Sequence, residues 1–236
     1  MTCWEARGKK YGMIPLRDNI PTRTFPIITA CIIVVNIIIF VWLRVTFAAP
    51  EGEVVYKYYG LVPKEFTASL TARWDLIPYN LMTVFTSMFL HGGVLHLVGN
   101  MLYLWIFGNN VEDAMGHPRF VAFYLLSGIM AATFQFFYDP DSNIPMIGAS
   151  GAVSGILGAY LVLFPFARIK TLLFIIIFIK IVELPAVVLL TIWFFMQILY
   201  SGAGGVAWYA HIGGFIFGLL TIKLFSKRPA LRARRS

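Results

Sequence analysis

The sequence predicts an all-α, polytopic membrane protein with six membrane-spanning helices, and three observations support this. First, 59% of its 236 residues are hydrophobic and only 13% are charged, whereas soluble domains carry about 25% charged residues. Second, several apolar runs approach the roughly 20 helical residues that cross a bilayer core of about 30 Å. Third, basic residues gather before the first run and after the last, which is typical of cytoplasmic ends. A soluble domain of this size could not bury so much apolar surface.

The distribution of charge predicts the domain organisation. We expect residues 1–24 to form a basic cytoplasmic tail, residues 25–225 a membrane domain, and residues 226–236 a second basic cytoplasmic tail. Beside membrane spans, a net charge of +8 indicates contact with anionic lipid head groups rather than with nucleic acid. The N-terminal segment lacks the features of a cleaved signal or transit peptide, so we expect a multi-pass protein of a prokaryotic plasma membrane.

Six apolar segments are the candidate spans, and polar segments separate them. In chain order the spans are 25–47, 91–107, 120–138, 147–164, 184–200 and 208–224. The loop 48–85 is too polar to cross but rich in aromatic residues, so it is expected to lie at the membrane interface. The segments 108–119 and 165–183 are expected to be cytoplasmic. Within the latter, the apolar run 171–179 is too short to cross and is expected either to lie at the interface or to extend the fifth helix.

Polar side chains inside spans are costly and therefore indicate function. His96 and Asn100 are four residues apart, which places both on one face of the second helix. At 1.5 Å per residue, Ser150 lies about 21 Å, and Asn100 and His211 about 18 Å, from the cytoplasmic ends of their helices. Three helices therefore offer an amide, a hydroxyl and an imidazole at a similar depth below the outer surface.

This group of side chains has the composition of a serine hydrolase site. The stretch Gly148-Ala149-Ser150-Gly151 is expected to open a helix at Ser150, where free N–H groups and the positive end of the helix dipole favour an oxyanion. Ser150 is the candidate nucleophile and His211 the candidate general base. His96 and Asn100 could donate further hydrogen bonds to the oxyanion. Because no acidic residue lies near this depth, we expect a Ser–His dyad without a third member.

Several of these patterns also have a purely structural interpretation. Small residues four apart, as in Gly151/Gly155 and Gly214/Gly218, commonly allow membrane helices to pack closely. Both interpretations are compatible, since close packing would bring Ser150 to His211. Other polar residues are not expected to take part in chemistry: Ser154 is expected in helix packing, His91 in an interfacial or structural role, and Glu112 with Asp113 in cytoplasmic anchoring.

The sequence resembles the rhomboid family of intramembrane serine proteases over roughly residues 25–225. The motifs that carry the resemblance are His96-xxx-Asn100, Gly148-Ala149-Ser150-Gly151, Ala210-His211-Ile212-Gly213-Gly214 with Gly218, and Glu112 with Gly108 and Gly116. The resemblance implies Ser150 as nucleophile, His211 as general base, and an oxyanion hole of His96, Asn100 and the Ser150 backbone N–H. It also implies transmembrane protein substrates cut in or near a membrane segment, without a cofactor or metal.

The chain departs from the family pattern at two places. Many members carry a Trp-Arg pair where this sequence has Met82-Thr83, and many place an aromatic residue beneath the histidine where this sequence has Ser154. A catalytically inactive relative that binds membrane clients is an alternative, although every expected catalytic group is present. A small transporter is a second alternative, but the sequence lacks the internal repeat and paired midplane charges expected of one.

Overall fold

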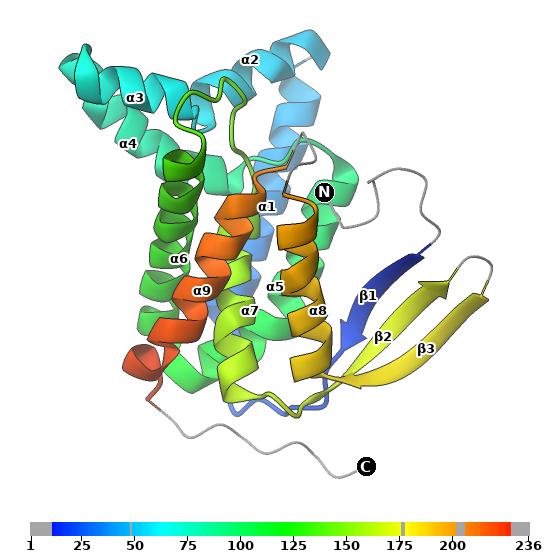
Figure 1. Cartoon of the computed structure of the whole chain (residues 1–236). Coiled ribbons are helices and arrows are strands. Elements are labelled where there is room, and N and C mark those ends of the chain that lie inside the picture. Colours follow the sequence, from blue (N-terminus) through cyan, green and yellow to red (C-terminus); the bar gives the residue numbers. More distant parts are fainter. Residues whose placement is uncertain (1–10, 48, 176–177, 202–205, 228–236) are drawn as a thin grey trace.

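The computed structural model describes residues 11–47, 49–175, 178–201 and 206–227. Most of these residues belong to a helical bundle, with a small sheet at one side of it (Figure 1). The six longer helices are α1 (Ile27–Thr46), α5 (Val94–Met115), α6 (His117–Tyr138), α7 (Ser150–Leu163), α8 (Ala186–Leu199) and α9 (Trp208–Phe225). The predicted helical membrane architecture is therefore confirmed.

The segment between α1 and α5 folds into short helices that lie across one end of the bundle (Figure 1). They are α2 (Ala49–Tyr59), α3 (Pro63–Thr71), η1 (Trp74–Leu76), α4 (Ile77–Thr86) and η2 (Ser87–Phe89). Leu61 pairs with Met146 in an isolated antiparallel bridge, which ties these helices to the segment that leads into α7.

The helices differ in how well their lengths match a bilayer. In the described part of the chain, α1, α6 and α9 are long and apolar enough to cross singly. The pair Trp74–Phe89 and Val94–Met115 forms a fourth candidate that is bent by 83°. Helices α7 and α8 have 14 residues each, or about 21 Å at 1.5 Å per residue. Six helices are thus compatible with six crossings, but the number of crossings itself stays a prediction.

Helix α5 is longer than predicted, and its extra length anchors α1. The expected loop 108–119 is wrong over most of its length, because α5 continues to Met115 and α6 begins at His117. Glu112 is only 1% exposed. Its carboxylate accepts hydrogen bonds from the backbone N–H of Ile28 (2.9 Å) and from the backbone N–H and hydroxyl of Thr29 (2.8 and 2.7 Å). Asp113 likewise accepts from the backbone N–H and hydroxyl of Thr24. These carboxylates therefore satisfy donors at and just before the start of α1, while the cytoplasmic position expected for them stays a prediction.

Residues of the segment expected to be cytoplasmic form strands instead of an extension of α8. An antiparallel sheet of order β1-β2-β3 joins β1 (Tyr11–Arg17), β2 (Arg168–Ile175) and β3 (Phe178–Pro185). Met13 lies opposite Leu173, and Leu172 lies opposite Ile181. The segment is rich in β-branched residues, which favour strands over helices. Part of the predicted N-terminal tail is therefore built into the fold, while the tail's position relative to the membrane stays a prediction.

The glycine pattern brings α7 and α9 into backbone contact. A Cβ atom at Gly218 would lie 1.8 Å from the Gly155 carbonyl oxygen, and one at Gly214 would lie 2.1 Å from the Gly151 carbonyl oxygen. Only glycine fits at such distances, as the small-residue spacing predicted. The two helices run parallel, so their first turns lie side by side.

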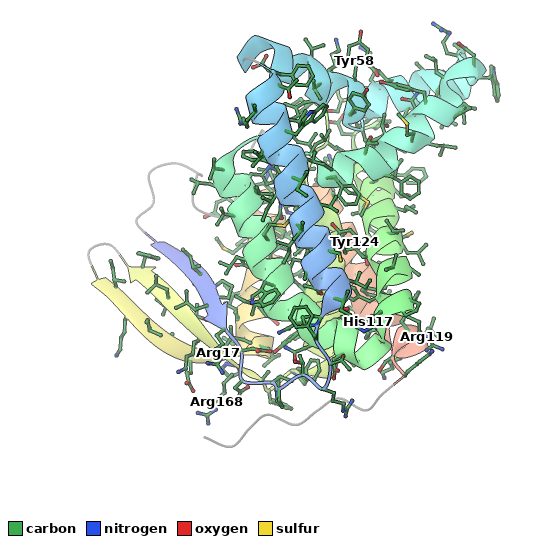
Figure 2. All side chains as sticks on the ribbon, turned by 180° about the vertical axis from the view of Figure 1, so that it is seen from behind. Arg17, Tyr58, His117, Arg119, Tyr124 and Arg168 are labelled. Atoms are coloured by element: carbon green, nitrogen blue, oxygen red, sulfur yellow. The ribbon has the colours of Figure 1, made fainter. Side chains whose placement is uncertain are left out.

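Three arginine side chains lie at the same end of the bundle (Figure 2). Figure 2 shows Arg17, Arg119 and Arg168 at one end of the bundle and Tyr58 of α2 at the other. Arg119 donates a hydrogen bond to the Phe225 carbonyl oxygen (3.1 Å), which fixes its side chain at the end of α9. The first turn of α7 lies toward the end that carries α2 to α4 (Figure 1).

Candidate active site

The first turns of α7 and α9 bring a hydroxyl and an imidazole together. Ser150 is the first residue of α7, as predicted, and His211 is the fourth residue of α9. Ser150 Oγ and His211 Nε2 are 2.8 Å apart, a hydrogen-bond distance. His211 is only 7% exposed. The close glycine contacts within the next two turns place these two side chains within reach of each other.

A third polar side chain contacts His211 from α8. Gln197 Oε1 lies 2.8 Å from His211 Nδ1, and Gln197 Nε2 donates to the Trp193 carbonyl oxygen at 2.9 Å. Gln197 was not among the candidate residues predicted from the sequence. Its signal was present, because an amide in an otherwise apolar run stands out by the same reasoning that selected Asn100.

The loop that leads into α7 is held by η2 and by the segment that joins η2 to α5. Gly148 has φ of +118°, a conformation that favours glycine. Its N–H donates to the Ser87 carbonyl oxygen (2.9 Å), and the N–H of Ala149 donates to His91 Nε2 (3.4 Å). His91 therefore has the structural role expected of it, but as a buried hydrogen-bond acceptor rather than at an exposed interface.

His96 and Asn100 face this loop from α5. A Cβ atom at Gly148 would lie 2.6 Å from His96 Nε2 and 3.6 Å from Asn100 Nδ2. Asn100 Nδ2 is buried and has no hydrogen-bond partner among the residues that the structure describes. A buried donor without a partner is costly in a structural role, and it is suited to receive a ligand oxygen beside Ser150.

One pocket joins these four side chains. It has a volume of about 360 Å³ and is lined by His96, Asn100, Ser150 and His211. Apolar side chains form most of its remaining wall, including Leu95, Val98, Leu102, Val153, Leu157, Trp193 and Trp208, with Met13, Ile14 and Phe174 of the sheet. All four residues selected from the sequence therefore lie in the same pocket, within a largely apolar surround.

Ser154, which stands where the resemblance implies an aromatic residue, is hydrogen-bonded within its own helix. The Ser154 hydroxyl donates to the Ser150 carbonyl oxygen at 2.7 Å, so it is satisfied within its own helix. Aromatic rings approach His211 from α8 and from its own helix: the ring centroids of Trp193 of α8 and Trp208 of α9 each lie 6.1 Å from the imidazole centroid. These rings flank the imidazole in place of the aromatic residue that the resemblance implies at position 154.

A second polar cluster lies outside the pocket, where the N-terminal segment meets α5 and α7. Asp18 accepts hydrogen bonds from the Tyr160 hydroxyl (2.6 Å) and from Asn110 Nδ2 (2.5 Å). Burial of the carboxyl raises the pKa of Asp18 to about 6, because the charged form is poorly solvated there. This cluster links the N-terminal segment to the bundle far along α7 from Ser150. Among the described residues, no three His, Cys, Asp or Glu side chains group into a metal site.

A family model and the similar proteins point to the same family. A model of the rhomboid domain matches residues 78–228, which is more than half of the chain. Rhomboid protein 1, mitochondrial, of Saccharomyces cerevisiae is 32% identical over 149 residues, covering 59% of this chain and 40% of the yeast protein. Rhomboid protease GluP of Bacillus subtilis is 32% identical over 136 residues (58% and 24%), and rhomboid protease AarA of Providencia stuartii is 29% identical over 145 residues (56% and 49%).

The alignments cover less than half of the length of each of these three relatives. The matched region includes α5 to α9, and with them the pocket residues His96, Asn100, Ser150 and His211. Two of the relatives are named as rhomboid proteases. The chain is therefore a membrane protein that belongs to the rhomboid family.

Proposed function

We propose that this protein is an intramembrane serine endopeptidase that hydrolyses peptide bonds in or near transmembrane segments of other membrane proteins. The observation that carries the proposal is the 2.8 Å distance between Ser150 Oγ and His211 Nε2 inside a pocket of about 360 Å³. A hydroxyl hydrogen-bonded to an imidazole is the arrangement of an activated nucleophile.

In the proposed reaction, Ser150 Oγ forms a bond to the carbonyl carbon of the scissile peptide while its proton passes to His211 Nε2. The carbonyl oxygen becomes the oxyanion of a tetrahedral intermediate. The C–N bond then breaks, and His211 returns the proton to the leaving nitrogen. Water attacks the acyl-enzyme ester, gives a proton to His211, and releases the new carboxyl end as Ser150 Oγ regains its proton.

The proposed oxyanion hole consists of His96, Asn100 and the backbone N–H of Ser150. Support comes from the unpartnered, buried Nδ2 of Asn100 and from the close approach of His96 Nε2 to Gly148. Because Ser150 is the first residue of α7, its N–H belongs to the turn whose N–H groups have no partner within the helix. Donors that are already in place stabilise the developing charge without reorganisation.

The substrate class follows from the surroundings of the pocket. Its walls are mostly apolar and lie among helices that belong in a bilayer, so we propose transmembrane proteins as substrates and lipids as neighbours. Arg17, Arg119 and Arg168 lie at the end of the bundle opposite Tyr58 of α2 (Figure 2). We therefore propose that this end and both termini face the cytoplasm. The relatives include bacterial and mitochondrial proteins, so they do not favour the expected prokaryotic plasma membrane over other membranes.

The test compares wild type with Ser150→Ala and His211→Ala in proteoliposomes that contain a single-span substrate. Both substitutions should abolish cleavage, and a fluorophosphonate probe should label wild type but not Ser150→Ala. Ser127→Ala is the matched control, because Ser127 is a buried serine of α6 outside the pocket. Thermal unfolding in detergent checks that each variant is folded.

Cleavage at the wild-type rate by either folded variant would overturn the assignment. A wild-type protein that binds the substrate without cutting it, and that the probe does not label, would favour the client-binding alternative instead.

A further inference from the structure

We propose that Gln197 is a positioning residue that keeps His211 in the one neutral form that can act as a base toward Ser150. This inference rests on the proposed function for its consequence in catalysis. The structural part of the proposal does not depend on catalysis: the Gln197 amide on α8 selects which ring nitrogen of His211 on α9 carries the proton. Neutral imidazole has one donor nitrogen and one acceptor nitrogen, so fixing one fixes the other.

The hydrogen bonds form a continuous series with one direction. Gln197 Nε2 donates to the Trp193 carbonyl oxygen at 2.9 Å, which leaves Gln197 Oε1 facing His211 Nδ1 at 2.8 Å. An amide oxygen only accepts, so His211 Nδ1 must carry the proton. His211 Nε2 is then an acceptor, and Ser150 Oγ donates to it across 2.8 Å. This is the proton arrangement that general-base catalysis requires.

The backbone of α8 decides the orientation of the amide. In the opposite orientation, Gln197 Oε1 would face the Trp193 carbonyl oxygen, and its NH₂ group would face His211 Nδ1. Two oxygens would then oppose each other in the helix, and the imidazole would be driven to the form with its proton on Nε2. That form has no lone pair for the Ser150 proton. The Trp193 carbonyl, which only accepts hydrogen bonds, excludes this arrangement.

The hydrogen bond between Gln197 and His211 is buried, which makes its loss costly. Gln197 is 2% exposed and His211 is 7% exposed, so water does not readily replace a lost bond. The rings of Trp193 and Trp208 lie near the imidazole and restrict its rotation, but a carbon face offers no acceptor for Nδ1–H. Within the described part of the pocket wall there is no carboxylate, so a neutral amide takes the orienting position that an aspartate holds in a Ser–His–Asp triad.

The experiment uses Gln197→Met, Gln197→Glu and, as a matched control, Gln135→Met. Methionine fills a similar volume but offers only a weak acceptor. Glutamate keeps an accepting oxygen at the same reach, and its protonated form, which burial favours, still donates to the Trp193 carbonyl oxygen. Gln135 also accepts a hydrogen bond from α9, from the backbone N–H of Ala210 at 3.3 Å, but its partner is not His211. Gln135→Met therefore removes a hydrogen bond to the same helix without touching the imidazole.

For cleavage of a single-span substrate in proteoliposomes, Gln197→Met should lower kcat by about 10–100-fold with little change in KM. The loss should be smaller than the roughly 10⁴-fold that a wrong tautomer causes in a Ser–His–Asp triad, because methionine allows both tautomers and imposes neither. Gln197→Glu should retain most of the wild-type kcat, and Gln135→Met should leave kcat unchanged. Wild-type kcat in Gln197→Met would overturn the proposal.

A second readout does not depend on activity. In a Ser150→Ala background, the ring ¹⁵N chemical shifts of His211 above its titration range should report a proton on Nδ1. Adding Gln197→Met should give a mixture of both tautomers, while adding Gln135→Met should not. The His211 signals are identified by their loss in His211→Ala.

The two readouts separate the proposals. An inactive wild-type protein that the probe does not label would refute the proposed function, yet the tautomer measurement would still decide the role of Gln197. Conversely, unchanged ¹⁵N shifts in the Ser150→Ala/Gln197→Met protein would refute that role even if wild type cleaves its substrate.

Discussion

One added methyl group at Gly218 tests whether the backbone contact between α7 and α9 holds Ser150 and His211 together. In Gly218→Ala the new Cβ atom would lie 1.8 Å from the Gly155 carbonyl oxygen, and real Cβ contacts essentially never fall below 3.0 Å. Backbone lies on both sides of this contact, so no side chain can turn away. The helices must therefore separate by at least about 1.2 Å at this point.

The same displacement at the first turns would lengthen the 2.8 Å Ser150–His211 contact to about 4 Å, beyond hydrogen-bond range. Misplacement of reacting groups by about 1 Å can cost 10²-fold in rate. Overpacking of a tight contact typically costs about 1–3 kcal/mol of stability, and the absence of a flexible neighbour favours the upper end of that range. We therefore expect Gly218→Ala to lower kcat by about 10²-fold and to lower the free energy of unfolding by about 3 kcal/mol.

The measurements are the rate of substrate cleavage, the rate of fluorophosphonate labelling, and the unfolding temperature in detergent. Gly52→Ala is the matched control, because a Cβ atom at Gly52 of α2 meets nothing within 4 Å. The control should be neutral or slightly stabilising, since alanine favours helix over glycine. Wild-type labelling and an unchanged unfolding temperature in Gly218→Ala would show that this contact does not position the pair.

Three further substitutions probe other parts of the structure. Asn100→Ala should lower kcat by about 10²–10³-fold in cleavage assays, as expected for one oxyanion donor. Glu112→Gln should lower the unfolding temperature, because an NH₂ group would replace one of two oxygens that accept bonds from Ile28 and Thr29, at about 1–3 kcal/mol. The pKa of Asp18 is raised from 3.8 to about 6 in the folded protein. The protonated carboxyl therefore stabilises the folded state fully below about pH 4, and this contribution is lost as the pH rises through about 6. The free energy of unfolding should fall by about 3 kcal/mol over this range. Asp18→Asn should remove this slope from unfolding measured between pH 4 and 7.

Each of these expectations has a contrary outcome. An Asn100→Ala protein with wild-type kcat would remove that amide from the oxyanion hole. Equal unfolding temperatures for wild type and Glu112→Gln would mean that the carboxylate is not what secures the start of α1. For Asp18, a wild-type stability that rises between pH 4 and 7, with the same slope in Asp18→Asn, would contradict the expected direction.

Local patterns predicted the features that depend on neighbouring residues. The helix start at Ser150 and the helix end at Tyr138 follow from hydrophobicity and from small or polar residues next to an apolar run, and both agree with the structure. Helix periodicity placed His96 and Asn100 on one face, and both line the same pocket. The glycines of α7 and α9 predicted a close contact, because small residues at four-residue spacing have few other uses in membrane helices.

Local patterns failed where a contact between distant segments overrides them. Helix α5 continues past Phe107 because its polar residues Glu112 and Asp113 bind donors at the start of α1, more than 80 residues earlier in the chain. Hydropathy alone ends a span at such residues, since an unpaired charge in an apolar setting is costly. Once paired and buried, the same carboxylates stabilise the helix contact.

The sequence by itself determined that the chain enters a membrane as helices. It also determined which polar side chains inside those helices are candidates for a functional site. Only the tertiary structure decided that residues 11–17 pair with β2 and that Gln197 meets His211. Strand pairing and side-chain contact depend on where separate segments lie in space, and hydrophobic periodicity reports only which face of each segment is buried. The identity of the partner across that buried face is decided when the segments pack.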